Sequence, residues 1–353
     1  MPSGVRGIEL CDFLDQDRLA VQIAELYQEW DMYRQPWLNK VAEIRDYIFA
    51  TDTSTTTNNV LEWKNSVHIP KLCQIRDNLH ANYMATLKPN DDAIAWDGDD
   101  ESAESAEKRE VIQSYIANKL RQSMFWTEAS RLVYDWIDYG NCFAMTEYVN
   151  EQITDPLTGE ITSGYVGPRM IRVSPQDIVF NPVAATFEES PKIIRSIKTL
   201  ASLKSDIDDR PEMAYMAEVF NKMMDKRGQF QGLNEKDFQR NTAFLVDGFG
   251  SFMEYFKGDY VEILEFYGDI FDKESGELHK NQIITVVDRS WVIRKQTNPS
   301  WFGKANIFHC GWRLRPDNLY AMGPLDNLVG MQYRIDHLEN AKSDAYDLII
   351  HPV

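Results

Sequence analysis

The stretch that decides the fold of the C-terminal part of the chain reads Asn318-Leu-Tyr-Ala-Met-Gly-Pro324 and runs directly into Leu325–Ile350. A proline is tolerated at the first position of a helix, because its missing N–H would be unpaired there anyway. From Pro324 to Ile350 there is no further proline, and the only glycine is Gly330. The run therefore predicts one helix of roughly 40 Å, at about 1.5 Å per residue.

The two sides of this predicted helix differ in chemistry. Its apolar residues recur at helical spacing and form one stripe, which predicts that the helix packs on neighbours along that side. The stripe consists of Leu325, Leu328, Ile335, Leu338, Ala345 and Ile349. The opposite side carries Asp336, Asn340, Asp344 and Asp347. A surface helix packed on its own domain is the simpler interpretation, but one packed and one acidic face favour an assembly element.

The run Leu319–Pro352 resembles the stem helix of portal (head–tail connector) proteins of tailed double-stranded DNA bacteriophages, most closely those of short-tailed phages. In that family a Tyr-x-Met/Leu-Gly-Pro/Ser segment leads into a helix with an Asn/Asp-rich face and a final proline. Three further segments fit the same family in the same order. They are Tyr139–Asn141, Val173–Pro182 and Lys192–Arg195.

The resemblance implies a structural subunit, not an enzyme, in a homo-oligomeric ring of about twelve copies with closed symmetry. Such a ring assembles in the host cytoplasm and sits at one capsid vertex of the virion. It forms the channel for packaging and ejection of double-stranded DNA, and it contacts the major capsid protein, the terminase and tail or adaptor proteins. By this resemblance Asp336, Asn340, Asp344 and Asp347 would face the channel or a neighbouring subunit.

The pattern along the chain predicts an α+β fold. Helical periodicity indicates helices over residues 15–32 and 37–50, separated at Pro36, and over 69–87, 102–125 and 127–139. Alternating residues indicate two hairpins, 142–149 with 165–173 and 260–271 with 282–288. We expect a helical N-terminal part of the wing (1–140), an α+β wing (141–318) and a first stem helix (319–353). The family's clip, second stem helix and crown would lie outside this chain.

Composition narrows the possible partners. The formal net charge of −18 over 353 residues argues against a protein that binds DNA along its outer surface, since such binding needs Lys and Arg to release counterions. An acidic lumen, by contrast, would repel phosphate and let a duplex slide. No apolar run reaches the length of a membrane span, so we expect no membrane partner. The four cysteines form no Cys-x-x-Cys pair, which favours small buried thiols.

The acidic run Asp91–Glu101 is the only candidate for metal-dependent chemistry, and it supports the alternative hypothesis of a nuclease. An EF-hand needs oxygen ligands at alternate positions, but with Gly98 as the central glycine two of these positions are Ala93 and Ala95. The chain also has no phosphate-binding loop and no His-x-x-Glu-His motif. We therefore expect no catalytic residues, no metal and no cofactor. A head–tail adaptor protein is a third alternative.

The segment 289–315 is basic in an otherwise acidic chain. Its cations interleave with Trp291, Trp301 and Trp312. They would contact DNA phosphates or an acidic neighbouring subunit, or else stack on tryptophans at a solvated sheet edge. The candidate interface or DNA-contact residues are Arg289, Arg294, Lys295, Lys304, Arg313 and Arg315.

Overall fold

The computed structural model describes residues 8–10, 16–49, 65, 67–89, 103–154, 161–210, 213–227, 260–272, 276–300 and 303–350. The chain divides into two compact units, each made of two separated stretches. Unit 1 comprises residues 1–36 and 176–305, and unit 2 comprises residues 37–175 and 306–353. This division differs from the expected sequential one, because strands from the middle of the chain pair with partners far along the sequence. The α+β class is confirmed.

Unit 1 is built on one sheet. Its strand order is β4-β5-β6-β7-β8, and β1 pairs in parallel with β6. The strands are β1 (Ile8–Leu10), β4 (Ile178–Phe180), β5 (Lys192–Thr199), β6 (Tyr260–Asp272), β7 (Leu278–Val287) and β8 (Trp291–Thr297). The pairs from β4 to β8 are antiparallel, and β6 with β7 forms the second hairpin that the sequence predicts.

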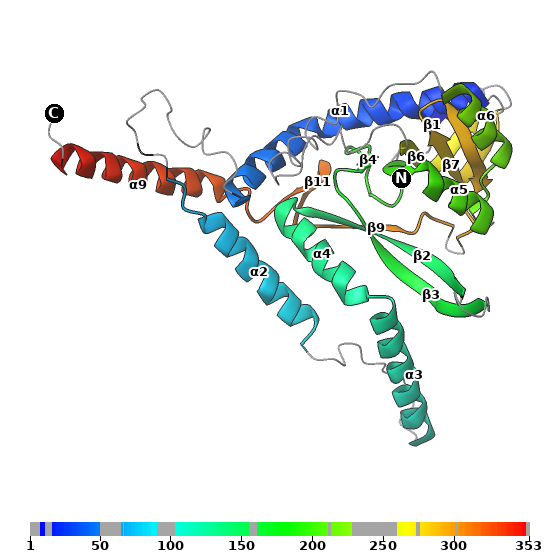
Figure 1. Cartoon of the computed structure of the whole chain (residues 1–353), viewed down its shortest axis with the longest axis horizontal. Helices are drawn as coiled ribbons and strands as arrows, with labels where there is room; N and C mark the ends of the chain where they lie inside the picture. Colours follow the sequence, from blue (N-terminus) through cyan, green and yellow to red (C-terminus); the bar gives the residue numbers. More distant parts are fainter. Residues whose placement is uncertain are drawn as a thin grey trace. The chain divides into compact units, whose positions relative to one another are not determined.

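Helices cover both faces of this sheet (Figure 1). The first half of α1 (Gln16–Phe49) packs its apolar side, from Leu19 to Trp30, on one face. Helices α5 (Leu200–Asp209) and α6 (Ala217–Arg227) pack on the other face. Alternation along β6 separates the two cores, since Val261 and Ile263 point to α5 and α6 while Leu264 and Phe266 point to α1.

Helix α1 continues through Pro36, although the sequence predicts a break there. A proline inside a helix removes one hydrogen bond and strains the preceding turn. Here both halves of the helix have a buried apolar side, Leu19–Trp30 before the proline and Leu38–Ile48 after it. The burial on each side offsets the cost of the proline. The chain passes from unit 1 into unit 2 at this point.

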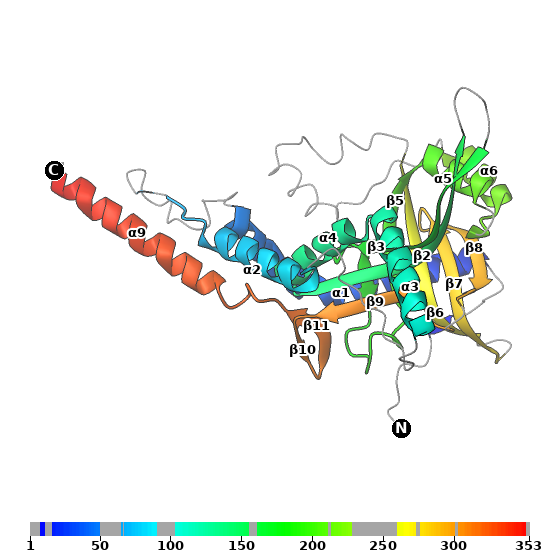
Figure 2. The ribbon, with the colours of Figure 1, turned by 90° about the horizontal axis from the view of Figure 1, so that it is seen from below.

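Unit 2 contains helices α2 (Lys71–Leu87), α3 (Ala103–Gln122), α4 (Phe125–Asp138) and α9 (Val329–Ile350), together with the second half of α1. Its core joins Ile44 and Ile48 of α1, Leu72 of α2 and Ile137 of α4 to Leu325. Leu325 therefore anchors the stretch ahead of α9. The C-terminal half of α9 extends beyond α2 (Figures 1 and 2).

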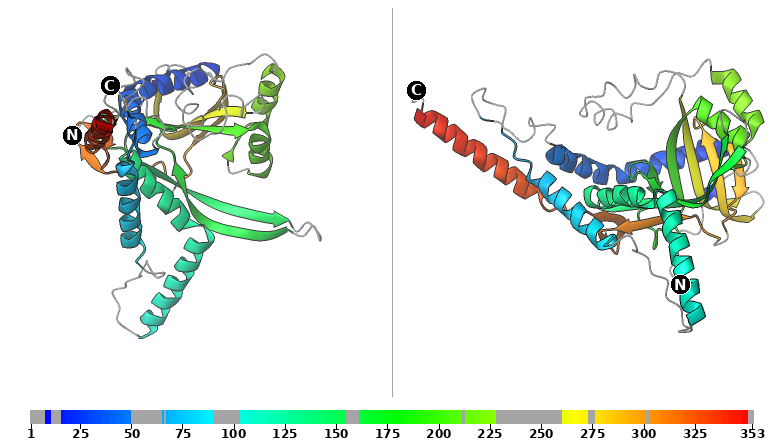
Figure 3. Two further views of the ribbon diagram at one scale, coloured as in Figure 1. Left: turned by 60° about the vertical axis from the view of Figure 1, so that its left-hand side comes forward. Right: turned by 60° about the horizontal axis from the view of Figure 1, so that its bottom comes forward.

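Two small sheets complete unit 2. The first has the order β3-β2-β9, with β2 (Asn141–Thr154), β3 (Ile161–Val173) and β9 (Ile307–Gly311). Antiparallel pairing of β2 with β3 confirms the first predicted hairpin, which projects from the unit, as α3 does (Figure 3). The second sheet pairs β10 (Arg313–Arg315) with β11 (Asn318–Met322), directly ahead of α9.

Helix α9 begins at Val329, five residues later than predicted from Pro324. Residues 324–328 form turns, in which Leu328 N–H donates to the Leu325 carbonyl at 2.9 Å. Burial of Leu325 in the core and partial burial of Leu328 hold these turns. The apolar contact with α1 and α4 thus sets where the helix starts.

Candidate functional site

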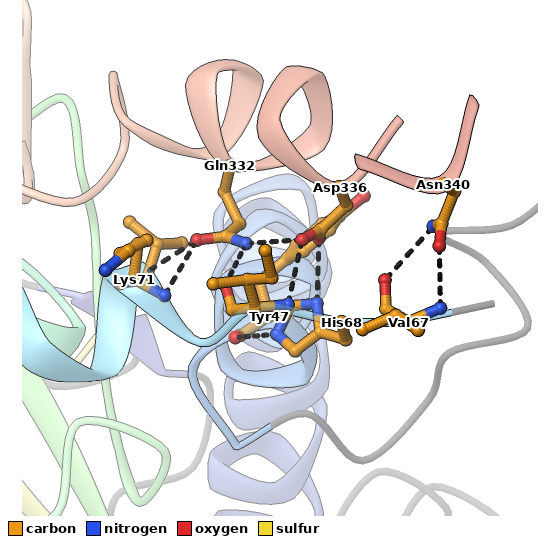
Figure 4. Close-up of polar contacts among 9 residues, drawn as sticks. Tyr47, Val67, His68, Lys71, Gln332, Asp336 and Asn340 are labelled. Atoms are coloured by element: carbon orange, nitrogen blue, oxygen red, sulfur yellow. Dashed lines mark hydrogen bonds and ion pairs between the residues drawn. The ribbon is translucent and has the colours of Figure 1, made fainter. Parts of the chain in front are cut away.

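The polar side of α9 binds Asn65 and residues 67–72 of the same unit, and Figure 4 shows the contacts of Val67, His68 and Lys71. We call its five residues the polar ladder; they are Gln332, Asp336, Asn340, Asp344 and Asp347. The first four recur every fourth residue, so they lie one above another on one side of the helix. Gln332, Asp336 and Asn340 are buried. The segment that they bind lies about 270 residues earlier in the sequence.

Gln332 caps helix α2 from outside that helix. Its Oε1 accepts hydrogen bonds from the backbone N–H groups of Lys71 at 3.1 Å and Leu72 at 3.2 Å. These are the first donors of α2, which have no partner within the helix. The N-cap residue is Pro70, whose side chain provides no cap. Gln332 thereby supplies the acceptor that Ser or Asp usually provides at this position.

Asp336 is fully buried and all its bonds stay within the unit. Its Oδ1 accepts from Ile69 N–H at 3.0 Å and from Gln332 Nε2 at 2.9 Å. Its Oδ2 lies 2.8 Å from Nδ1 of His68, whose Nε2 lies 3.1 Å from the Tyr47 carbonyl oxygen. The imidazole ring of His68 thus bridges the Asp336 carboxylate and the Tyr47 carbonyl.

The remaining members of the ladder hold the extended stretch before His68. Asn340 accepts from Val67 N–H at 2.8 Å and donates to the Val67 carbonyl at 3.0 Å. Asp344 accepts from the backbone N–H of Asn65 at 2.8 Å. Asp347 accepts from the Asn65 side chain at 2.8 Å. The side chains of α9 thus take the place of a neighbouring strand for an extended segment that has no sheet partner among the described residues.

This placement contradicts the expectation of a channel or a neighbouring subunit for two of the four predicted residues, Asp336 and Asn340, and leaves it a prediction for Asp344 and Asp347. Asp336 and Asn340 are covered by the chain's own residues and cannot line a lumen in this conformation. Asp344 is half-buried and Asp347 exposed, but both bind Asn65. The physical reason is that the backbone donors of an extended segment and of a helix start need acceptors, and this side of α9 supplies them.

The apolar stripe of α9 has the opposite outcome. Leu325 and Leu328 pack in the core as predicted, but the members within the helix do not. Leu338 is 56% exposed and Ile349 73% exposed. Met331, Ile335 and Ala345 on the same side are exposed as well. Helix α9 therefore buries its polar side and exposes its apolar side.

The segment Tyr139–Asn141 forms a joint with the strand that leads to α9. Gly140 has a φ of +69°, and a Cβ added to it would lie 2.7 Å from the Gly323 Cα. Asn141 is fully buried; it accepts from Ala321 N–H at 2.9 Å and donates to the Ala321 carbonyl at 3.0 Å. Nε2 of the half-buried His309 lies 2.9 Å from the same side-chain oxygen.

The predicted basic residues do not form one patch. Arg289 pairs with both carboxylate oxygens of Glu262, at 2.7 and 2.9 Å, and Arg195 pairs with the same carboxylate at 2.6 Å. Burial alone would raise the pKa of Glu262, but the two guanidinium groups outweigh it and lower this pKa. Arg294 is buried on β8. The burial of Arg294 contradicts the expectation that it contacts DNA or a neighbouring subunit, whereas for the half-buried Arg289 that contact stays a prediction.

The other four candidates are more accessible. Lys295 is half-buried on β8, and exposed Lys304 pairs with Glu188 at 2.7 Å. Arg313 and Arg315 are both exposed on β10 in unit 2. Of the tryptophans expected beside the cations, Trp312 instead contacts Trp136, with ring centroids 4.6 Å apart. Trp301 lies outside the described residues.

The acidic run Asp91–Glu101 also lies outside the described residues. Within the described ranges, no group of three or more His, Cys, Asp or Glu side chains is placed to hold a metal ion. The helices that the structure describes include none that is both long and apolar enough to cross a membrane. Neither a scan against models of protein families nor a search of curated proteins finds a match to this chain.

Sequence reasoning missed two features of this site. It did not foresee that α9 would bind Asn65 and residues 67–72, because hydrogen bonds to backbone groups leave no pattern in the partner sequence. A signal was present in the spacing of Gln332, Asp336 and Asn340, which places three amide or carboxylate groups in one row. It also missed the proximity of Cys142 and Cys310, which face each other across β2 and β9.

Proposed function

We propose that this chain is a structural subunit of a portal-like ring at a capsid vertex of a tailed bacteriophage. In this proposal α9 packs against another copy of the chain. The ring encloses a channel for DNA and offers surfaces for the capsid protein, the terminase and tail or adaptor proteins. The resemblance of residues 319–352 to a portal stem helix supports it, and the exposed apolar side of α9 is the structural observation that carries it.

The exposed side of α9 supports an oligomer for an energetic reason. An isolated surface helix normally buries its apolar stripe and exposes its polar side, and α9 does the reverse. Burying apolar surface is favourable by roughly 25 cal/mol per Å². Met331, Leu338 and Ile349 are more than half exposed, so a partner that covered them would gain this free energy of burial. Contiguous exposed apolar surface on a protein marks an interaction site.

The charge of the chain is compatible with a channel. A ring of subunits that each carry a formal charge of −18 would repel the phosphates of a duplex. Such repulsion disfavours tight binding and favours passage. In this proposal the polar ladder has a different role from the one expected, since it fixes α9 to Asn65 and residues 67–72 and leaves the apolar side outward.

The oligomeric state in solution tests the proposal. Sedimentation velocity of the chain, followed by electron microscopy down the symmetry axis, should show closed rings of about twelve copies. Replacing Leu338 and Ile349 by Gln should shift the distribution toward monomers and leave circular dichroism unchanged. As a matched control, Val111→Gln changes an apolar residue of similar exposure on α3, away from α9. A chain that stays monomeric at every concentration would overturn the proposal.

The nuclease alternative has a separate test. Calorimetric titration with Mg²⁺ or Ca²⁺ should show no tight binding. Micromolar binding that is lost in Asp97→Ala, together with cleavage of DNA, would favour the nuclease. An adaptor would instead form a ring only after mixing with a second protein.

A further inference from the structure

Two cysteines that are far apart in the sequence face each other in unit 2. Cys142 lies on β2 and Cys310 on β9, and the antiparallel register places them directly opposite. Residues directly opposite in a sheet have side chains on the same face. Neither cysteine forms a disulfide in this structure. The sequence-based expectation of buried thiols is therefore wrong for Cys310, which is exposed, and Cys142 is only half-buried.

The hydrogen bonds on either side show whether Cys142 and Cys310 are a hydrogen-bonded or a non-hydrogen-bonded pair of the antiparallel ladder. Trp312 N–H donates to the Gly140 carbonyl at 2.8 Å, and Thr146 N–H donates to the Asn306 carbonyl at 3.1 Å. Hydrogen-bonded pairs alternate along an antiparallel ladder, so Cys142 and Cys310 form such a pair, with Cα atoms about 5.5 Å apart. Disulfides most often join Cα atoms about 5.5–6 Å apart. The backbone therefore holds the two Cα atoms within the range that disulfides span, and bond formation requires the Cβ atoms to approach by about 1 Å.

The surroundings give the two thiols different reactivity. The Cys142 Sγ lies 3.5 Å from the Cys310 carbonyl oxygen. The nearby Cys142 thiol lowers the pKa of Cys310, whereas the Cys310 thiol and burial raise the pKa of Cys142. Cys310 is exposed and Cys142 is half-buried, so Cys310 is the thiol that an oxidant reaches first, and Cys142 is the second, resolving thiol.

We propose that Cys142 and Cys310 form a reversible disulfide site whose oxidant is a low-molecular-weight disulfide such as oxidised glutathione. A metal is the competing use of two close thiols, but within the described residues no third ligand completes a metal group. The neighbouring His309 points to the opposite face of the strand and binds Asn141.

The chemistry balances as two thiol–disulfide exchanges. The Cys310 thiolate attacks one sulfur of oxidised glutathione, a mixed disulfide forms, and one glutathione leaves. Cys142 then loses its proton and attacks the Cys310 sulfur, and the second glutathione leaves with that proton. The protein loses two electrons and two protons in total, and the oxidant is reduced to two thiols.

The disulfide would tie β2 covalently to β9. Strand β9 leads through β10 and β11 to α9. The bond would therefore fix the base of α9 to the hairpin β2–β3. This inference stands on the register of one sheet and does not depend on the oligomer proposed above.

The test uses the full chain with Cys11→Ser and Cys73→Ser, so that only the pair remains. The protein is equilibrated in glutathione buffers from fully reduced to fully oxidised, quenched in acid, alkylated and weighed by mass spectrometry. We expect a species that lacks two hydrogens, accepts no alkyl group and yields one cross-linked peptide containing residues 142 and 310. In the first matched variant, Cys142→Ser, the reaction should stop at one bound glutathione. In the second, Cys310→Ser, the reaction with oxidised glutathione should be slower by a factor of about ten or more.

Peptide mapping of the unaltered chain gives the same measurement if the serine variant does not fold. The proposal is overturned if both thiols remain alkylatable in buffer that saturates the mixed disulfide of Cys142→Ser. It is also overturned if the only disulfide formed joins two separate chains. Failure of ring formation has no bearing on either outcome, so the two proposals fail separately.

Discussion

The position of Gly140 imposes two requirements that only glycine, which has no Cβ, satisfies. Its φ of +69° lies in the left-handed region, which costs a residue with a Cβ roughly 1–2 kcal/mol. Its backbone also approaches Gly323 so closely that a Cβ would overlap the backbone atoms there. Gly276 has nearly the same φ, +70°, but open space around it. Comparing Gly140 with Gly276 therefore separates the cost of the backbone conformation from the cost of the close approach to Gly323.

We expect Gly276→Ala to lower the free energy of unfolding by about 1–2 kcal/mol, the cost of the backbone conformation. Gly140→Ala should lower it by about 2–5 kcal/mol, because forcing extra atoms into a packed contact adds about 1–3 kcal/mol. Chemical denaturation of both variants measures the difference. An equal decrease in the free energy of unfolding of the two variants would show that the close approach to Gly323 does not contribute to the cost of Gly140→Ala.

At the scale of elements, the attachment of α9 depends on a buried carboxylate. Asp336 pairs with His68 and accepts from Ile69 and Gln332. Removing the carboxylate leaves buried donors without their acceptor, which costs about 1–3 kcal/mol for each unsatisfied group. Asp347 is exposed and bonds only Asn65 among the described residues, so its removal should cost less than about 0.5 kcal/mol.

We therefore expect Asp336→Ala to release residues 67–72 from α9, while Asp347→Ala leaves them bound. Hydrogen exchange of the Ile69, Lys71 and Leu72 amides reports this directly, because Asp336 and Gln332 are their acceptors. Exchange in Asp336→Ala should accelerate at all three amides. Unchanged protection there would mean that packing around Leu72, and not the polar ladder, holds the segment.

Much of the element content was predictable, since it depends on local periodicity. The hairpins β2–β3 and β6–β7 and the helices α2 and α4 appear within a few residues of their expected bounds. Which side of α9 is buried was not predictable, because periodicity identifies the two sides of a helix but does not show which of them meets the rest of the protein. The polar side is buried because Asn65 and residues 67–72 have backbone N–H groups that require acceptors. No local sequence pattern in that segment indicates this requirement.

At the scale of the whole molecule, Arg313 and Arg315 are the predicted cations that remain exposed in unit 2. In the ring proposed above, strongly acidic subunits would have to offset like-charge repulsion at each interface. Arginine suits this role because its planar fork can pair with a carboxylate through two hydrogen bonds. Losing such a pair at an interface costs about 2–5 kcal/mol.

Replacing both Arg313 and Arg315 by Glu should leave the subunit folded by circular dichroism but impair ring formation in sedimentation. The matched control is Lys304→Glu, an exposed cation that pairs with Glu188 inside unit 1. Rings that form with unchanged yield and salt tolerance in the Arg313→Glu Arg315→Glu variant would place these arginines away from the interface.

The interleaved order of the two units has a consequence for synthesis. The apolar side of α1, from Leu19 to Trp30, packs against strands that end with β8, and Val292 of that strand follows Trp30 by about 260 residues. At a translation rate of roughly 5–20 residues per second, the ribosome needs roughly 13–50 s to make this stretch. During that interval the nascent helix has no sheet to cover it. We expect a ribosome-bound chaperone to cover this apolar side of α1 during that interval.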